Sequence, residues 1–217
     1  MTIQNGKILE SSVERMGVPK RLVKCELGTF PDARIRELLL AKAKNWTPGD
    51  CLMLVGDTGR GKTGLAISVI KELISKAVKW ETVKEDTPIS MVVDSILSLT
   101  QMLFINTVDL LPALRSNIEK SETIISELKK VKLLVLDDLG AEKPSDFGIE
   151  TLYRILNERY NELRSTIITT NHTPGDLKKL FNSAGIGIGI TGDRLISRMN
   201  GWCELVMLAG PDLRKHE

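Results

Sequence analysis

The sequence predicts an α/β fold in which a parallel sheet has helices on both faces. Three observations lead to this prediction. Short segments rich in apolar residues, each about the length of one strand, recur along the chain, and apolar residues at helical spacing fill the stretches between them. Strands that alternate with helices form parallel sheets. A chain of 217 residues is also long enough to bury one such core.

The composition is that of an ordinary globular protein. Hydrophobic residues make up 42% of the chain and charged residues 27%. The formal net charge is only +2, so any contact with nucleic acid or an acidic membrane has to come from local patches. The chain has no apolar run of about 18 residues, and its first residues lack the apolar core of a signal peptide. We therefore expect a cytoplasmic protein with no membrane partner.

The cysteines and histidines give no sign of a metal site. Cys25, Cys51 and Cys203 are odd in number, far apart and without a CxxC pair, so we expect reduced thiols and no disulfide or zinc framework. His172 and His216 have no partners at ligand spacing.

We expect the first part of the chain to be a lead-in to the main domain. Residues 1–45 are mixed and basic, and their pattern suggests loops or short helices without a core of their own. Residues 46–217 are expected to form the main domain. It opens with a turn at 46–50 and a fully apolar strand at 51–55.

The later elements follow from the spacing of apolar residues. A helix is predicted from Lys62, with Leu65, Val69, Leu73 and Ala77 in one row. The segment 95–106 is ambiguous, although its end at 103–106 has the character of a strand. The remaining elements are a polar loop at 79–88, a mostly helical stretch at 108–130 with an irregularity at Pro112, strands at 133–137, 166–171 and 203–208, and a helix whose apolar face comprises Ile149, Leu152, Tyr153, Leu156, Tyr160 and Leu163.

A complete phosphate-loop motif, GxxxxGK[ST], lies between the first strand and the helix that follows it. Its glycines allow backbone N–H groups to surround phosphate oxygens, and the helix N-terminus adds a positive end. The lysine would reach the β- and γ-phosphates, and the hydroxyl of the last residue would bind Mg²⁺. A plain helix-capping turn would explain the glycines but not the lysine and threonine. The expected nucleotide-binding residues are Gly56, Asp57, Thr58, Gly59, Arg60, Gly61, Lys62, Thr63 and Gly64.

Two acidic residues follow the strand at 133–137, at the sheet edge where open α/β sheets bind their ligands. We assign Asp137 to the Mg²⁺ shell, usually through water, and Asp138 to orienting or deprotonating an attacking water. Paired acids favour hydrolysis over phosphoryl transfer to a small substrate. The simpler interpretation is a pair of acids that ends the strand and caps the next segment.

Other polar residues are weaker candidates. Asn171 ends the next apolar strand, where its amide can hold the water or touch the γ-phosphate, although such a residue is often only part of a turn. Arg194 and Arg198 share one helix face, which is either a solvated basic face or a source of an arginine for a neighbouring subunit. The glycines at 185–193 follow no clear strand, so we expect a mobile loop and no dinucleotide fingerprint. Trp46, Trp80 and Trp202 are expected to be core or interface residues.

Taken together, these motifs resemble the DnaC/DnaI helicase loaders. The loaders are AAA+ ATPases of the initiator clade, which also contains the IstB-type transposition helpers. The resemblance covers about residues 50–217 and rests on GDTGRGKTGLA, LLVLDDLGAEKPSDFGIETLYRILNERY, TIITTNHTP, RLISRM and GPDLR. It implies an AAA+ P-loop core with a parallel five-stranded sheet sandwiched by helices and no full lid domain. The residues it assigns are Gly56 to Thr63 as Walker A, Asp137 and Asp138 as Walker B, Asn171 as sensor 1, Arg198 as arginine finger and Arg214 as sensor 2.

The resemblance also implies a function and partners. Such loaders bind ATP with Mg²⁺, assemble into rings, spirals or filaments, and act on a replicative helicase. Single-stranded DNA would lie along the inserted region after 104, with Arg115, Asn117 and Lys120 as candidate contacts. This chain departs from the pattern in its short lead-in, its longer stretch at 76–102 and in Pro112, which we expect to interrupt the DNA-contacting helix. The alternatives are an IstB-like helper of a transposase on duplex DNA and, with less support, a small-molecule P-loop kinase.

Overall fold

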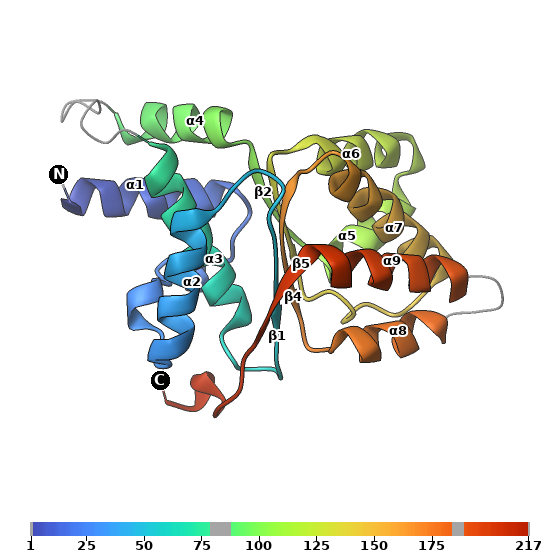
Figure 1. Cartoon of the computed structure of the whole chain (residues 1–217). Coiled ribbons are helices and arrows are strands. Elements are labelled where there is room, and N and C mark those ends of the chain that lie inside the picture. The colour runs from blue at the N-terminus through green and yellow to red at the C-terminus, as the bar shows by residue number, and fades with distance from the viewer. Residues whose placement is uncertain (1, 79–87, 184–188, 217) are drawn as a thin grey trace. The chain divides into compact units, whose positions relative to one another are not determined.

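The computed structural model describes residues 2–78, 88–183 and 189–216 (Figure 1). The chain forms two compact units, and both draw on separated parts of the sequence. One unit comprises Met1–Trp46 and Thr63–Phe104, and the other comprises Thr47–Lys62 and Ile105–Glu217. The first 46 residues therefore pack with later helices in one unit.

The first unit is mainly helical. Its lead-in contains longer helices than the sequence suggested, because Ile8 and Leu39, which are fully buried, give both of them an apolar side. The second of these helices is capped at its start by Asp32, whose carboxylate accepts hydrogen bonds from the backbone N–H groups of Arg34 and Ile35. The helices of this unit are α1 (Thr2–Arg15), α2 (Ala33–Asn45), α3 (Lys62–Ala77) and α4 (Ile89–Thr100), with short 3₁₀ turns η1 (Lys20–Leu22) and η2 (Leu27–Thr29). The first residue of α3, Lys62, belongs to the other unit.

The segment whose sequence pattern was ambiguous divides into a helix and a strand. Helix α4 ends at Thr100 and is capped by Gln101, which adopts the left-handed conformation with φ 47°, and β2 (Met102–Asn106) follows immediately. Of the polar loop expected at 79–88, residues 79–87 lie outside the described residues, and so does Trp80. Trp46 is partly buried, and the amine of Lys42 lies 5.7 Å from the centre of its ring.

The second unit contains most of the five-stranded sheet, whose strand order is β2-β3-β4-β1-β5. Strand β1 pairs with β4 and with β5, and β3 pairs with β4, all in parallel, with Leu54 opposite Thr169 and Leu136 opposite Ile168. Every residue of the three central strands is buried, as expected of strands covered on both faces. The predicted parallel sheet is confirmed. These strands are β1 (Cys51–Val55), β3 (Leu133–Asp137), β4 (Ser165–Thr170) and, at one edge, β5 (Cys203–Met207).

Figure 1 shows the helices of the second unit gathered on one face of its strands. Helix α7 buries Ile149, Leu152 and Leu156 as predicted, whereas Leu163 lies beyond its end and is exposed. The rim of the predicted face is also partly open, since 39% of Tyr160 is exposed. These helices are α5 (Thr107–Ser116), α6 (Ile118–Lys130), α7 (Asp146–Asn161), α8 (Pro174–Asn182) and α9 (Gly189–Trp202).

The expected interruption at Pro112 is wrong. Helix α5 continues through Pro112, and the break comes at Asn117, whose φ of −137° and ψ of 80° are not helical. The side chain of Asn117 accepts a hydrogen bond from the N–H of Lys120 and so caps the start of α6. Pro112 is an interior residue of α5 and removes one backbone hydrogen bond, and the buried Leu111 and Leu114 on either side of it hold α5 in place.

The expectation of reduced thiols throughout is also wrong. Cys51 and Cys203 form a disulfide although 152 positions separate them. They are register partners at the start of the neighbouring strands β1 and β5, with a Cα–Cα distance of 4.3 Å. The pairing depends on which strands are neighbours, which the spacing of the cysteines does not reveal. Cys25 is not part of a disulfide.

The glycine-rich segment is only partly a loop. Residues 189–193 belong to the first turns of α9, so the expected loop is wrong for them, and residues 184–188 lie outside the described residues. Within the described ranges, no helix combines the length and the apolar character that a membrane crossing requires.

Candidate nucleotide site

The phosphate-loop segment leaves β1 at the carboxyl edge of the sheet. The N–H of Gly56 donates to the carbonyl of Thr170 at 3.2 Å, which joins the loop to the end of β4. Gly59 and Gly61 have φ values of 82° and 76°, a conformation that L side chains rarely adopt. At Gly56, a Cβ would lie 2.6 Å from the carbonyl oxygen of Leu208. The glycine spacing therefore has local backbone reasons.

Lys62 is the central cation of the site. It is only 5% exposed, and its amine donates to the carbonyl of Asp57 at 2.9 Å and to Oδ1 of Asn171 at 2.6 Å. Burial lowers the pKa of this amine, and the carboxylates of Asp138 and Asp137 oppose that shift. The structure thus brings Lys62 together with Asn171 and close to both acids.

The paired acids are fixed by one hydroxyl on the neighbouring strand. Thr169 on β4 donates to Oδ1 of Asp137 at 2.7 Å, and its oxygen accepts from the N–H of Asp138 at 2.9 Å. Asp137 is 4% exposed, whereas Asp138 is partly exposed and has a left-handed φ of 58°. This turn of the backbone gives the two adjacent carboxyl groups different surroundings. Sequence reasoning missed Thr169, because a threonine in a strand carries no signal of its own.

A second group of hydrogen bonds supports the backbone around the acids. The hydroxyl of Thr107, at the start of α5, lies 2.9 Å from the carbonyl of Asp138 and 3.0 Å from Oε2 of Glu142, and it can donate to either. The same Oε2 accepts from the N–H of Gly140 at 2.9 Å. Glu142 belongs to one of the motif segments, but no spacing rule distinguished it there from the other charged residues.

The C-terminal turn, which comprises residues 208–214 after β5, brings Arg214 to the phosphate loop. The N–H of Leu213 donates to the carbonyl of Gly59 at 2.9 Å. The guanidinium of Arg214 binds the carboxylate of Asp212, with Nη2 2.8 Å from Oδ2. Arg214 is close enough for its charge to lower the pKa of Lys62. Asp212 was not among the expected site residues.

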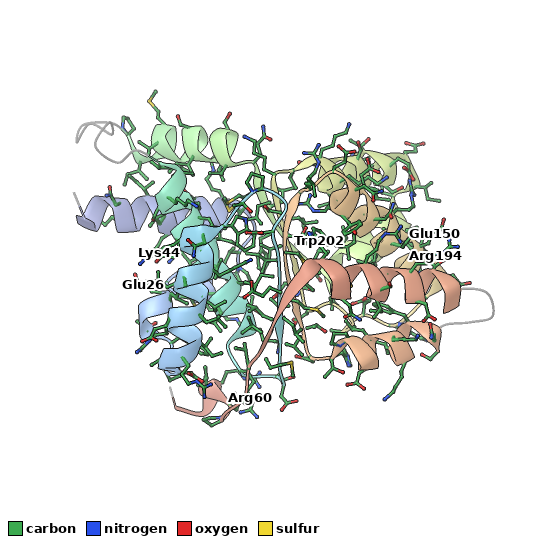
Figure 2. All side chains as sticks on the ribbon, viewed as in Figure 1. Glu26, Lys44, Arg60, Glu150, Arg194 and Trp202 are labelled. Atoms are coloured by element: carbon green, nitrogen blue, oxygen red, sulfur yellow. A yellow bond between two sulfur atoms is a disulfide. The ribbon has the colours of Figure 1, made fainter. Side chains whose placement is uncertain are left out.

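Arg194 and Arg198 lie elsewhere in the unit. Helix α9 places both on one side, as their spacing predicted. The guanidinium of Arg198 lies 5.3 Å from the centre of the Tyr153 ring, and its buried Nε has no hydrogen-bond partner among the described residues. Figure 2 shows Arg194 well apart from Arg60 of the phosphate loop. The fold therefore does not bring this helix face to the phosphate loop of its own chain.

The candidate DNA contacts are all exposed, and two of them already have intramolecular partners. Arg115 donates to Oγ of Ser145 at 3.0 Å and lies 5.4 Å from the centre of the Phe147 ring. Asn117 caps α6, while Lys120 contributes its backbone N–H to that cap.

Trp202 is partly buried, and its Nε1 donates to the carbonyl of Gly49 at 2.6 Å.

The residues present fit a nucleotide with Mg²⁺. Lys62 supplies a cation for the phosphates, and Nε and Nη1 of Arg60, also in the loop, are buried without a hydrogen-bond partner among the described residues. The oxygen of Asp137 is a ligand of the kind that Mg²⁺ prefers, and Thr63 and Gly64 continue the chain from Lys62 as the first turn of α3. In the described parts of the chain, no cluster of three or more His, Cys, Asp or Glu residues could hold a metal. Mg²⁺ is commonly held by one or two carboxylates, phosphates and water, so it needs no such cluster.

Known proteins share this fold. The crystal structure of the DnaC helicase loader matches with a TM-score of 0.66 and 26% identity, over 88% of this chain and 100% of that one. The crystal structure of DnaI matches with a TM-score of 0.68 and 20% identity, over 88% of this chain and 95% of that one, which is a likeness of fold. The expected α/β fold of the AAA+ P-loop type is confirmed.

Sequence comparison adds a family. An ATP-binding protein of Sinorhizobium fredii named for an insertion sequence, y4iQ/y4nD/y4sD, is 26% identical over 168 residues, which are 76% of this chain and 48% of that protein. The chain thus spans about half the length of this curated relative. A family model described as "IstB-like ATP binding protein" matches residues 82–217, more than half of the chain. The chain belongs to the family of IstB-like ATP-binding proteins.

Proposed function

We propose that this chain binds and hydrolyses ATP and serves DNA replication as a helicase loader of the DnaC/DnaI kind. The observation that carries the proposal is the position of the Lys62 amine, 2.6 Å from Oδ1 of Asn171 and near the carboxylates of Asp137 and Asp138. A cation, two acids and an amide thus meet where strands β1, β3 and β4 end. This set suits phosphate binding and the activation of a water molecule.

Each side chain has a separate task in this proposal. Bound ATP with Mg²⁺ supplies a γ-phosphorus that water can attack. Lys62 leaves Asn171 and Asp57 to bind the β- and γ-phosphates. Asp137 would hold the Mg²⁺ shell, usually through water, with its carboxylate fixed by the hydrogen bond from Thr169 to Oδ1. The more exposed Asp138 orients the attacking water and takes its proton.

The remaining site residues act at the edges of the nucleotide. Asn171, once released by Lys62, holds the water or contacts the γ-phosphate. Arg198 reaches the γ-phosphate of an adjacent copy. Two observations support this role: Arg194 on the same helix face lies well apart from Arg60 of the phosphate loop in Figure 2, and the buried Nε of Arg198 has no partner among the described residues. Donor and acceptor surfaces then differ, so the contact builds a ring, a spiral or a filament.

The replication partner is proposed from the extent of the DnaC likeness. The structure of that helicase loader is matched over its whole chain at 26% identity. We propose a replicative helicase as the protein partner and single-stranded DNA as a ligand of α5 and the start of α6. Arg115 and Lys120 are the cations there, and oligomerisation sums such weak contacts.

A second candidate is a transposase helper that acts on duplex DNA. The Sinorhizobium fredii relative, an ATP-binding protein named for an insertion sequence, favours this function. Both candidates use the same nucleotide site. Binding assays with ATP separate the two candidates. A helicase loader prefers single-stranded DNA and a hexameric helicase, whereas a transposase helper prefers duplex DNA and a transposase. A small-molecule kinase has less support because it leaves the paired acids and Arg198 without a role.

ATP binding is tested with Lys62→Ala. Lys62 is the first residue of α3 and alanine is a strong helix former, so the variant folds but loses a charge for the phosphates, and nucleotide affinity falls by at least about tenfold. Lys179→Ala, at an exposed position on α8, is the matched control and keeps wild-type affinity. Titration with a fluorescent ATP analogue measures both. Equal affinity of the folded Lys62→Ala variant and wild type would overturn the proposed site.

A further inference from the structure

The C-terminal turn after β5 is attached to the phosphate loop through its backbone. The N–H of Leu208 donates to the carbonyl of Val55 at 2.7 Å, directly before the loop begins. The N–H of Leu213 donates to the carbonyl of Gly59 at 2.9 Å, in the middle of the loop. These two hydrogen bonds fix where the side chains of this turn can lie.

The carboxylate of Asp212 lies directly against the phosphate loop. A Cβ built on Gly59 would lie only 2.0 Å from Oδ1 of Asp212, so this close approach requires glycine at position 59. An anion at this place is unexpected, because the loop has to receive the negative charge of a polyphosphate. The side chain therefore needs an explanation beyond loop structure.

The carboxylate holds the guanidinium of Arg214 at two points. Nε lies 3.1 Å from Oδ1, and Nη2 lies 2.8 Å from Oδ2. A guanidinium offers the same fork of donors to phosphate oxygens. The donors that Arg214 would use on a nucleotide are therefore already engaged by Asp212.

We propose that Asp212 is a positioning residue, which holds Arg214 beside the phosphate loop and competes with the terminal phosphate of a nucleotide for it. The inference rests on the proposed nucleotide site. When ATP binds, Arg214 exchanges the Asp212 carboxylate for phosphate oxygens. The exchange is easy because the pair is solvated, with side chains that are 58% exposed for Arg214 and 24% exposed for Asp212.

The competition predicts that removing the carboxylate tightens nucleotide binding. In the wild type, the backbone N–H of Arg214 donates to Oδ1 of Asp212 at 3.0 Å. Asp212→Asn keeps an oxygen that can accept this hydrogen bond, so the turn is preserved while the ion pair is lost. The affinity for a non-hydrolysable ATP analogue then rises by about two- to fivefold, the range expected for breaking an exposed ion pair. The affinity for ADP rises less, because ADP has no γ-phosphate.

A double-mutant cycle separates this role from simple charge repulsion. Asp212→Asn is compared in the wild-type background and in Arg214→Met, with thermal midpoints as a check on folding. If Asp212 acts by holding Arg214, the gain in affinity disappears in the Arg214→Met background. Glu122→Gln is the matched control. It breaks a similar ion pair, in which Arg154 donates to both carboxylate oxygens of Glu122, at a position distant in sequence from Asp212, and it leaves nucleotide affinity unchanged.

Two results would overturn the inference. One is an Asp212→Asn variant with affinity equal to or weaker than wild type, and the other is an equal gain in both backgrounds. Asp212→Ser provides the same comparison if the Asn variant does not fold. A wild-type protein that binds no ATP analogue would instead count against the proposed nucleotide site, so the two failures are distinguishable.

Discussion

At the scale of single residues, the site depends on polar groups that serve two neighbours at once. The hydroxyl of Thr169 fixes the side chain of Asp137 and the backbone of Asp138. Lys62, the paired acids and Asn171 could be proposed from the sequence, because the lysine belongs to the phosphate-loop motif and the other three end or follow apolar strands. Thr169, Glu142 and Asp212 could not be predicted, because their roles depend on which strand or turn lies beside them.

The division of roles between the two acids leads to a prediction for Asp138→Asn. The hydrogen bonds at Asp138 use its backbone, and asparagine tolerates a left-handed φ of 58°, so the fold is kept. An amide cannot accept the proton of the attacking water, so ATP turnover falls by about 10²-fold or more while ATP-Mg²⁺ still binds. Single-turnover hydrolysis and nucleotide titration measure the two effects. A wild-type rate would show that another residue acts on the water.

At the scale of elements, apolar runs identified the strands well. All five strands begin and end within a residue of the predicted positions. The lead-in helices were underestimated because their apolar residues are spread among many charges. The break at Asn117 was misplaced at Pro112, because proline is the stronger signal in a sequence although a cap can decide where one helix ends and the next begins.

A buried arginine connects several of these elements. Arg159 on α7 is 0% exposed. Its donors reach the carbonyl groups of Leu128 in the last turn of α6 and of Val131 just after it, at 2.8 and 2.9 Å, as well as Ser165 and Thr166 on β4. Arg159→Met keeps the bulk but leaves buried carbonyl groups without a donor. We expect the free energy of unfolding to fall by about 3 kcal/mol or more.

Denaturant unfolding of Arg159→Met and Arg154→Met compares a buried with an exposed arginine of the same helix. The Arg154 variant loses only a solvated pair with Glu122, so its cost stays within about 1 kcal/mol. Similar costs for the two variants would show that the buried contacts contribute little.

At the scale of the whole molecule, the position of Arg198 predicts complementation between copies. Arg198→Ala is expected to bind ATP but to lose most hydrolysis, since an arginine supplied in trans can raise such rates by about 10³–10⁵-fold, and we expect a smaller effect here. Mixed with Lys62→Ala, it forms some interfaces that join an intact phosphate loop to an intact arginine, so activity partly returns. ATP hydrolysis measured in mixtures of the two variants at different ratios tests this recovery of activity. No recovery at any ratio, with both variants folded and associating, would place Arg198 outside the active site of its neighbour.

The bond between Cys51 and Cys203 makes the chain between them a covalent ring. This ring contains the phosphate loop, both acids, Asn171 and the arginines of α9, while Asp212 and Arg214 lie on the tail outside it. One proteolytic cut anywhere inside the ring leaves the two pieces joined. A singly nicked protein should therefore run as one band on a denaturing gel without reductant and as two bands after reduction. Two bands without reductant would show that the two thiols are not joined in solution.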